Sequence, residues 1–389
     1  MIVMYLVINL YISNDIRYYG WKLLGINSYY RFFDDVAITP SNGSWTLEKH
    51  TIEWVNRKKV LIYAPTTFFG TPISDERFLY NCESTRDYCH ISNNLSDHPK
   101  ADAVVLHSRN YLKGGYQIPR KGPEQIFVAW TLESPINDHF TFERNYINWT
   151  MTYRLDSDVW HPYGYFAKLD RKEYVNLDEI WDMKNESLHL AAWLSSNCAT
   201  SNKRKELIHE LEQVGLKVDK WGECGTKLPN CDTSSKKADA CARNLIKRYK
   251  FYLAFENSNC VDYVTEKLYE TLEGRMAVPI VMSRQIYSRI GVPDDTFIAI
   301  DDFENLDDFV FRIKQIASDK ESYLEYHRWR ETYRIVAGMD ESTGFCELCR
   351  RLQLPRGLPK TYHNTHKWYS DGKCDSSFVN KYTSDDRMG

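Results

Sequence analysis

The sequence predicts an α/β protein with a doubly wound parallel sheet in its second half. Two patterns lead to this fold class: short apolar runs are separated by polar, turn-rich segments in the first half, and a strand–loop–helix unit recurs in the second. The length of 389 residues exceeds one typical core, so two domains are expected.

Three apolar runs form the expected sheet of the first half. Residues 60–64, 101–106 and 126–130 are each short enough for a buried strand, and the segments between them leave room for crossover connections. Together they predict an α/β domain over residues 56–180. The polar stretch 168–186 is the expected linker to the second domain.

The strand–loop–helix units of the second half are more regular. Four segments have the composition of strands: 188–194, 251–255, 277–281 and 297–300. The helix after the first of them ends at Gly215, and the helix after the second has Asp262 as its N-cap and Gly274 as its end. A second α/β domain is therefore predicted over residues 181–345.

The two ends of the chain are expected to lie outside these domains, as segments 1–55 and 346–389. Residues 1–12 are apolar apart from Asn9, but a membrane-spanning helix needs about 20 apolar residues. This stretch alone is too short. It remains open as the stub of a truncated anchor or stem, an atypical signal segment, a buried strand or a misassigned start.

Charge and cysteine content narrow the class of protein. A formal net charge of -3 provides no general attraction to polyanions, so nucleic acid is excluded as a partner. Four acceptor sequons for N-glycosylation begin at Asn42, Asn94, Asn148 and Asn185. Alongside ten cysteines, an even number, they favour an oxidising compartment and disulfides.

A zinc site is the alternative use of the cysteines. Cys346 and Cys349 have the spacing of one half of a zinc-binding signature. The other half would have to come from Cys82 and Cys89, which are too widely spaced for a usual zinc knuckle. Disulfides are therefore favoured over metal.

Two loops of the second half are candidate ligand sites, because ligands of such sheets bind beyond the carboxyl ends of the strands. One loop leads to Arg204, and the other leads to Tyr263, Glu266 and Lys267. Two cations beside two helix N-termini suit a diphosphate. The alternative is that Lys267 points to solvent beside Glu266 or Glu270.

Other nucleotide-binding patterns are missing or weak. The sequence contains no Walker loop and no G-x-G-x-x-G. Asp156 and Asp158 match the D-x-D pattern that holds a metal-bound nucleotide in another class of glycosyltransferases, but so short a pattern also arises by chance. A structural role is favoured for them.

Residues 250–268, with the sequence KFYLAFENSNCVDYVTEKL, closely resemble the signature of the α1,3-fucosyltransferases. Further similarity lies in Ala-Val-Pro-Ile-Val at 277–281, Trp-Thr-Leu-Glu-Ser-Pro at 130–135, and the Cys-x-x-Cys pair at 346–349. The resemblance extends over roughly residues 60–351 and implies a GT-B architecture, in which two Rossmann-like domains face each other across a cleft.

The resemblance also implies an inverting transfer of L-fucose from GDP-fucose to the 3-hydroxyl of GlcNAc. Glu133, in the Glu-Ser-Pro motif, is similar to the family's general base, a role that a carboxylate suits. Arg204 and Lys267 match the cationic residues that stabilise the departing GDP. Asn257, Tyr263 and Glu266 match positions that contact the nucleotide-sugar. No metal is required, and Mn²⁺ is at most stimulatory.

Expectations about topology and compartment follow from the same resemblance. Cys82 and Cys89 are expected to pair with Cys346 and Cys349, and these bridges would return the segment 346–389 to the N-terminal domain. The enzyme is expected in the Golgi lumen, as a single-pass type II protein of the cisterna membrane, acting on GlcNAc-containing glycans of glycoproteins or glycolipids. The competing functions are a GT-B enzyme with another nucleotide-sugar donor and a non-catalytic glycan-binding relative.

Overall fold

The computed structural model describes residues 58–383 and three strands ahead of them. Within 58–383 it leaves out residues 81, 83–84, 115–117, 185–188, 230, 232–239, 338–343 and 354–359. The three leading strands, which form an antiparallel sheet, are β1 (Arg31–Phe33), β2 (Val36–Ser41) and β3 (Ser44–Lys49). Residues 1–12, with the predicted anchor, lie outside the described residues, as do Asn42 and Asn185.

The first domain is built on a six-stranded parallel sheet in the order β11-β10-β9-β8-β4-β7. Its strands are β4 (Val60–Tyr63), β7 (Cys89–Ser92), β8 (Ala103–His107), β9 (Ile126–Trp130), β10 (Trp149–Thr152) and β11 (Val159–Trp160). Between them lie the hairpin β5 (Thr67–Phe68)–β6 (Thr71–Pro72) and short helices, α3 (Asp75–Phe78), η1 (Arg86–Tyr88), η2 (Leu95–Lys100) and α4 (Ser108–Gly114). The three strands predicted in this half are β4, β8 and β9.

Apolar side chains cover both faces of this sheet. Ile62, Val105 and Val128 belong to one buried cluster, whereas Val104 and Phe127 belong to another. Successive residues of a strand point to opposite faces, so β4, β8 and β9 each contribute to both clusters. A parallel sheet that is buried on both faces requires such continuous apolar strands.

The second domain contains a five-stranded sheet in the order β14-β13-β15-β16-β17, with every pair parallel. The strands are β13 (Ala191–Leu194), β14 (Val218–Trp221), β15 (Phe251–Leu253), β16 (Val278–Val281) and β17 (Ile298–Ala299). The helices are α6 (Arg204–Gln213), η3 (Gly222–Cys224), α7 (Ala240–Ile246), α8 (Glu266–Leu272), α9 (Arg284–Arg289), η4 (Ile300–Asp302), α10 (Leu306–Ser318), α11 (Lys320–Glu325) and η5 (Arg328–Glu331).

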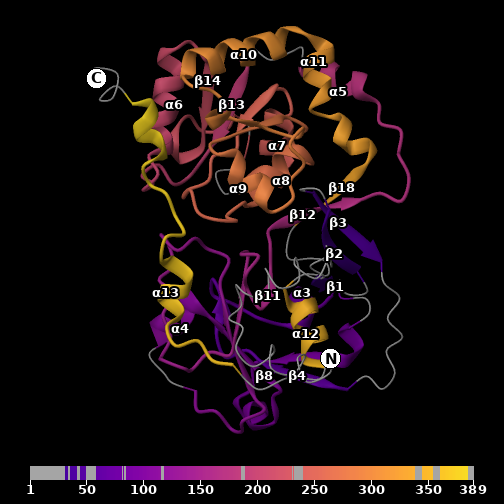
Figure 1. Cartoon of the computed structure of the whole chain (residues 1–389), viewed down its shortest axis with the longest axis vertical. Coiled ribbons are helices and arrows are strands. Elements are labelled where there is room, and N and C mark those ends of the chain that lie inside the picture. The colour runs from indigo at the N-terminus through magenta and orange to yellow at the C-terminus, as the bar shows by residue number, and fades with distance from the viewer. Residues whose placement is uncertain are drawn as a thin grey trace, which may run out of the picture.

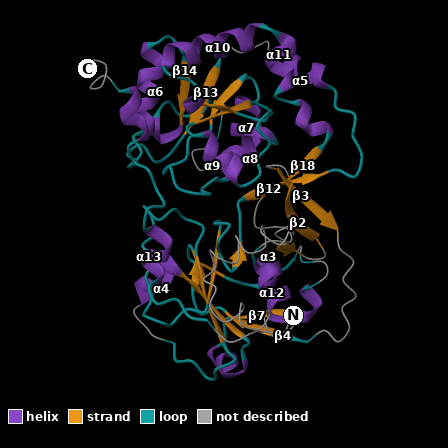
Figure 2. Cartoon of the chain, viewed as in Figure 1, coloured by secondary structure: helices purple, strands orange, loops and turns teal. Residues whose placement is uncertain are grey.

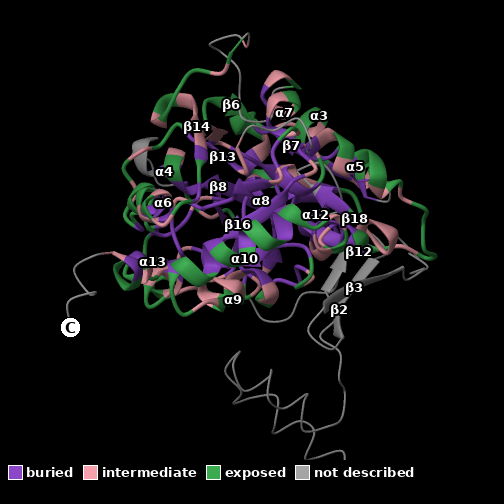
Figure 3. Cartoon of the chain, turned by 90° about the horizontal axis from the view of Figure 1, so that it is seen from above, coloured by how far each residue is buried: buried purple, intermediate pink, exposed green. Residues whose placement is uncertain are grey.

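Helices enclose the second sheet on both faces. Trp193 and Leu253 pack in one cluster with the apolar residues of α6 and α10, and Ala192 and Tyr252 pack in another with those of α8. Figure 2 shows the strands in the middle of each lobe, and Figure 3 shows that buried residues concentrate there while exposed residues lie on the outer helices. The doubly wound arrangement predicted for this half is confirmed.

The connection between the domains is more structured than a polar linker. Strand β12 (Gly164–Lys168) pairs antiparallel with β18 (Tyr333–Ala337), and this two-stranded ribbon lies between the lobes in Figure 1. The predicted linker 168–186 contains helix α5 (Leu177–Lys184), which buries Ile180 and Lys184. The prediction of a plain linker is wrong because these residues pack on the second domain.

The C-terminal segment contacts both domains. Helix α12 (Phe345–Gln353) packs its apolar residues into the first domain, and α13 (Thr365–Ser370) buries Tyr369 there as well. The chain then crosses to the second domain, where Val379 and Tyr382 of η6 (Phe378–Tyr382) join the core beside α6. The expected return of 346–389 to the N-terminal domain is therefore wrong for residues 378–382.

Five disulfides connect all ten cysteines. Cys82 pairs with Cys346 and Cys89 with Cys349, the two segments that the resemblance joins. The remaining bridges are Cys198–Cys224, Cys231–Cys241 and Cys260–Cys374. Zinc binds cysteine as the thiolate, and the sulfurs of Cys82, Cys89, Cys346 and Cys349 are all in disulfides. A zinc site made of these four cysteines is therefore excluded.

Removing a long-range disulfide should lower the free energy of unfolding more than removing a short-range one. Cys82 and Cys346 are 264 residues apart, whereas Cys231 and Cys241 are 10 apart. Because the Cys89–Cys349 bridge would hold Cys82 and Cys346 within a loop of about ten residues, the comparison is made in a chain that already lacks Cys89–Cys349. In that chain, the loop-closure entropy withheld from the unfolded state predicts a loss of about 5 kcal/mol for the double alanine variant of Cys82 and Cys346, and of about 2–3 kcal/mol for that of Cys231 and Cys241. Urea unfolding followed by tryptophan fluorescence checks this. Equal losses would contradict it.

Two local predictions are wrong. Asp262 does not cap α8, because its carboxylate accepts hydrogen bonds from Leu155 N, 3.0 Å away, and Arg289 Nε, 2.6 Å away; Thr265 is the N-cap. Asn148 is not an acceptor for a glycan in the folded chain. It is buried, and its amide nitrogen donates to Lys360 O at 2.9 Å.

Two further predictions concern a membrane-spanning helix and the glycosylation of Asn94. No helix among the described residues is long and apolar enough to cross a membrane. Asn94 is exposed at the start of η2, so its predicted glycosylation is sterically allowed. That glycosylation stays a prediction.

Candidate active site

Each sheet reverses its strand order at one point, and the loop after β9, which neighbours the first point, lies close to the loop after β15 at the second. The reversal is between β4 and β8 in the first sheet and between β13 and β15 in the second. Ligands of open α/β sheets bind beyond the carboxyl ends of the strands at such a switch point. Ser134, after β9, and Ser258, after β15, hold the two loops together with a 2.9 Å contact between their hydroxyls.

Glu133 lies in the loop after β9, and its main chain is fixed on both sides. Its N–H donates to Thr131 Oγ1 at 3.2 Å, and its carbonyl oxygen accepts a hydrogen bond from the Tyr369 hydroxyl. Tyr163 adds a hydrogen bond of 2.7 Å to the carbonyl oxygen of Leu132. The loop therefore presents the Glu133 side chain in a defined direction.

The two oxygens of the Glu133 carboxylate have different surroundings. Oε1 accepts hydrogen bonds from Tyr263 Oη at 2.7 Å, Ser134 N at 3.0 Å and Asn257 Nδ2 at 3.4 Å. Oε2 has no hydrogen-bond partner among the described residues. One oxygen thus anchors the side chain, and the other is available to a ligand.

A cavity of about 290 Å³ opens beside this carboxylate. Residues of the first domain form most of its wall, and Glu266 of the second domain completes it. The lining residues are Phe68, Phe69, His107, Arg109, Thr131, Leu132, Glu133, Asp138, Tyr163 and Glu266. The cavity therefore lies between the domains, at the predicted cleft.

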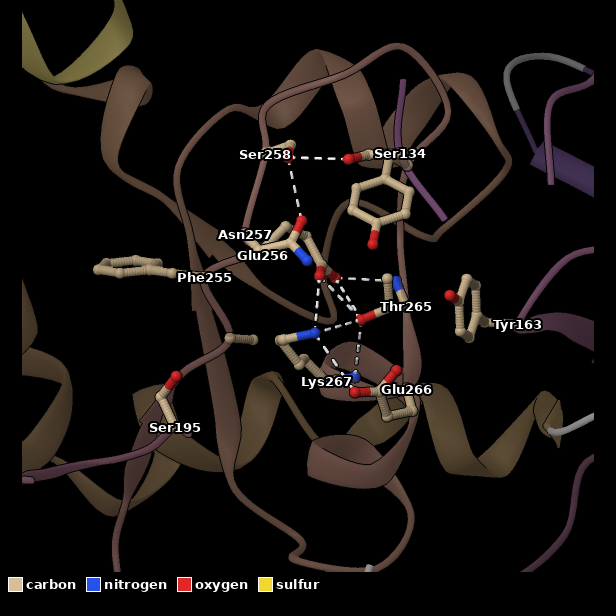
Figure 4. Close-up of polar contacts among 12 residues, drawn as sticks. Ser134, Tyr163, Ser195, Phe255, Glu256, Asn257, Ser258, Thr265, Glu266 and Lys267 are labelled. Atoms are coloured by element: carbon tan, nitrogen blue, oxygen red, sulfur yellow. Dashed lines mark hydrogen bonds and ion pairs between the residues drawn. The ribbon is translucent and has the colours of Figure 1, made fainter. Parts of the chain in front are cut away.

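Lys267 is buried at the start of α8 in a compact polar cluster. Its Nζ is 2.8 Å from Thr265 Oγ1, 3.0 Å from Glu256 Oε2 and 3.3 Å from Glu266 Oε1 (Figure 4). Burial opposes the charged form, but the two carboxylates outweigh it and raise the pKa of Lys267. Lys267 is therefore buried beside two carboxylates that favour its charged form, and it does not point to solvent, the alternative that the sequence left open.

Arg204 lies near enough to this cluster for its charge to interact with those of Glu256 and Lys267. It is 1% exposed and donates to Phe255 O at 2.8 Å, Ser195 Oγ at 2.7 Å and Asn197 O at 2.8 Å. Its Nε is buried without a hydrogen-bond partner among the described residues. Burial lowers the pKa of Arg204, and the Glu256 carboxylate opposes this shift. Arg204 thus joins the loops after β13 and β15 at the switch point.

The predicted site residues therefore converge. Glu133, Asn257 and Tyr263 are joined by hydrogen bonds, while Glu266 links the cavity wall to Lys267. Two residues that the sequence did not single out have central positions: Glu256, the buried partner of Lys267, and Tyr369, which holds Glu133 O. Glu256 lies within the 250–268 signature, so the resemblance could have indicated it. No sequence pattern marks Tyr369.

The D-x-D pattern has a structural role, as favoured. Asp156 forms an ion pair with Arg154, and Asp158 accepts a hydrogen bond of 2.8 Å from the Tyr362 hydroxyl. Asp158 also accepts from Thr150 N at 2.8 Å. These carboxylates hold the C-terminal segment on the first domain. Among the residues that the structure describes, no cluster of His, Cys, Asp and Glu is arranged to hold a metal ion.

Two family models match the chain. "Fucosyltransferase, N-terminal" covers residues 55–164, and "Glycosyltransferase family 10 (fucosyltransferase) C-term" covers residues 183–368. The chain is 42% identical over 335 residues to Alpha-(1,3)-fucosyltransferase fut-6 of Caenorhabditis elegans, with 84% of each chain covered. It is 34% identical over 305 residues to Alpha-(1,3)-fucosyltransferase C of Drosophila melanogaster, with 72% of this chain and 69% of that one covered.

A solved crystal structure of an α1,3-fucosyltransferase has a TM-score of 0.48 at 15% identity, over 81% of this chain and 94% of that one. The family models and the sequence relatives show that the chain belongs to glycosyltransferase family 10, the fucosyltransferases. The predicted enzyme class is confirmed. The GT-B architecture is confirmed as well, since two Rossmann-like domains meet at a cleft.

Proposed function

We propose that this fucosyltransferase moves L-fucose from GDP-fucose to the 3-hydroxyl of a GlcNAc residue in a glycan, with inversion at the sugar. The observation that supports this most is the Glu133 carboxylate, which has one oxygen anchored and the other free beside the interdomain cavity. The relatives named above are α-(1,3)-fucosyltransferases, which supports the linkage.

Glu133 acts as the general base in this proposal. The acceptor hydroxyl gives its proton to Oε2 as its oxygen forms a bond to the anomeric carbon of fucose. The bond between that carbon and the β-phosphate oxygen breaks at the same time, and GDP leaves with the electron pair. A positioned base of this kind contributes about 10²–10⁴-fold to the rate.

The leaving GDP gains negative charge, which Lys267 neutralises. All three donors of its ammonium group have partners in the structure, and the contact with Glu266, at 3.3 Å, is the longest. Exchanging Glu266 for a phosphate oxygen keeps the contacts to Glu256 and Thr265 intact. Arg204 and Asn257, which border the same loops, complete the donor site. The proposed mechanism includes no metal ion, and Mn²⁺ is at most stimulatory.

The acceptor is a GlcNAc-containing glycan of a glycoprotein or glycolipid, and the compartment is the Golgi lumen. Five disulfides and an exposed sequon at Asn94 favour an oxidising lumen. Attachment to the cisterna membrane as a single-pass type II protein is part of this proposal. Endoglycosidase treatment of the wild type and of Asn94→Gln, both from cells, checks glycosylation at Asn94.

A transfer assay tests the proposed function. Purified protein is incubated with GDP-fucose and a panel of N-glycan cores and N-acetyllactosamine chains, with EDTA in one arm, and mass spectrometry locates the added fucose. We expect fucose on O3 of a GlcNAc, and EDTA should lower the rate by less than about threefold, because the buried Lys267 supplies the cation. Transfer from another nucleotide-sugar alone, or glycan binding without turnover, would favour one of the competing functions.

A further inference from the structure

We infer that Tyr263 is a positioning residue for the base Glu133, and that the Cys260–Cys374 disulfide keeps Tyr263 in place. The inference rests on the proposed role of Glu133. It assigns to Tyr263 a task beyond contact with the nucleotide-sugar, namely to hold the carboxylate across the domain boundary.

The hydrogen bond between Tyr263 and Glu133 is short and enclosed. Tyr263 Oη is 2.7 Å from Glu133 Oε1, and Tyr263 is 2% exposed. Its ring centroid lies 4.9 Å from that of Tyr153 and 6.4 Å from that of Tyr163, which limits its rotation. Burial raises the pKa of Tyr263, so the hydroxyl stays protonated and donates to the carboxylate.

This hydrogen bond joins residues that belong to different domains in the chain. Glu133 follows β9 of the first domain, whereas Tyr263 lies ahead of α8 in the second. The same two loops are also joined by the Ser134–Ser258 contact and by the hydrogen bond from Asn257 to Glu133, so Tyr263 acts within a closely packed junction. With Oε1 engaged by Tyr263, Oε2 is left without a hydrogen-bond partner among the described residues, on a side chain that lines the cavity.

The segment after α13 holds the Tyr263 loop. Cys374 is bonded to Cys260, and Val261 N donates to Lys373 O at 2.7 Å. A few residues earlier, α13 itself supplies the Tyr369 hydroxyl that donates to Glu133 O. Glu133 is thus held at its side chain by one tyrosine and at its main chain by another, and a disulfide joins the segments that carry them.

A double-mutant cycle tests this inference through the turnover number. Tyr263→Phe removes the hydroxyl but keeps the ring. At saturating GDP-fucose and acceptor, we expect kcat to fall about 10-fold, the effect of losing a hydrogen bond to a charged group. The acceptor KM should change less than about twofold. In a Glu133→Ala background, where no carboxylate remains to be held, Tyr263→Phe should lower kcat by less than about twofold further.

Other outcomes overturn the inference. If Tyr263→Phe lowers kcat by the same factor with and without Glu133, then Tyr263 does not act through the base. GDP titration of each variant establishes that the protein is folded. A wild-type chain that transfers no fucose would instead refute the proposed function, so the two failures are distinguishable.

A second set of variants tests whether the Cys260–Cys374 disulfide keeps Tyr263 in place. Replacing Cys260 and Cys374 by serine should lower kcat about 3–10-fold, because the Tyr263 loop loses its covalent tie. In that background Tyr263→Phe should have a smaller effect than in the wild type. An unchanged kcat would show that the disulfide is not needed to keep Tyr263 in position against Glu133. The matched control removes Cys231–Cys241, which joins neither segment, and should leave kcat within about twofold.

Discussion

Glu133→Gln should lower the turnover number at least about 100-fold while GDP-fucose binding stays within about twofold of the wild type. Glutamine has the size of glutamate and retains an oxygen that can accept from Tyr263, so the loop geometry is preserved. What it lacks is the ability to take a proton at the position of Oε2. Initial rates at saturating substrates and calorimetric titration with GDP-fucose, without acceptor, measure the two effects separately.

Asp156→Asn is the matched control for Glu133→Gln. It also converts a carboxylate to an amide, but Asp156 pairs with Arg154 away from the cavity wall. Its kcat should stay within about threefold of the wild type. Near-normal turnover in Glu133→Gln would show that Glu133 is not the base. An equal loss of turnover in Asp156→Asn would instead favour a role for Asp156 in binding the nucleotide, the alternative given by the D-x-D pattern.

Lys267→Ala should weaken GDP binding about 10–100-fold, slow the transfer and destabilise the second domain. The first two losses arise because a charge-assisted hydrogen bond to phosphate is worth about 1.5–3 kcal/mol. The third arises because Glu256, which is almost fully buried, would lose its cation. Removing one partner of a buried pair costs about 3–5 kcal/mol. Calorimetry with GDP and thermal unfolding measure these effects.

A double variant separates ligand binding from stability. Lys267→Met with Glu256→Gln removes both charges of the buried pair, and such replacements are close to neutral for stability. We expect a melting temperature nearer to the wild type than that of Lys267→Ala, with GDP affinity still reduced about 10-fold or more. Wild-type GDP affinity in a well-folded double variant would show that Lys267 serves only to neutralise Glu256.

The elements that the sequence predicted well are those whose local pattern agrees with their packing. Strand β9 is apolar at all five positions because both faces of the first sheet are covered, and its predicted bounds are those observed. Helix α6 has its apolar stripe on the sheet and ends before Gly215, whose φ of +91° suits glycine. Strands β7 and β10 were not predicted, because polar residues interrupt the apolar run in each of them.

The errors come from contacts between segments far apart in the chain. Asp262 has the composition of an N-cap, but it accepts from Leu155 of the other domain. Asn148 fits a sequon, which is a pattern of three residues and carries no information on burial. The partnership of Lys267 with Glu256 depends on how the loop after β15 folds back, and the hold of Tyr369 on Glu133 depends on a segment 236 residues away.

A crystal structure of the Glu133→Gln variant with GDP-fucose and an N-acetyllactosamine or N-glycan core acceptor would test the arrangement of the site most directly. We expect the GlcNAc 3-hydroxyl within about 2.6–3.2 Å of the side-chain atom that replaces Oε2. The β-phosphate should lie within hydrogen-bonding distance of Lys267 Nζ, in the place that Glu266 now occupies. An acceptor bound away from residue 133, or a diphosphate with no contact to Lys267, would contradict the proposed mechanism.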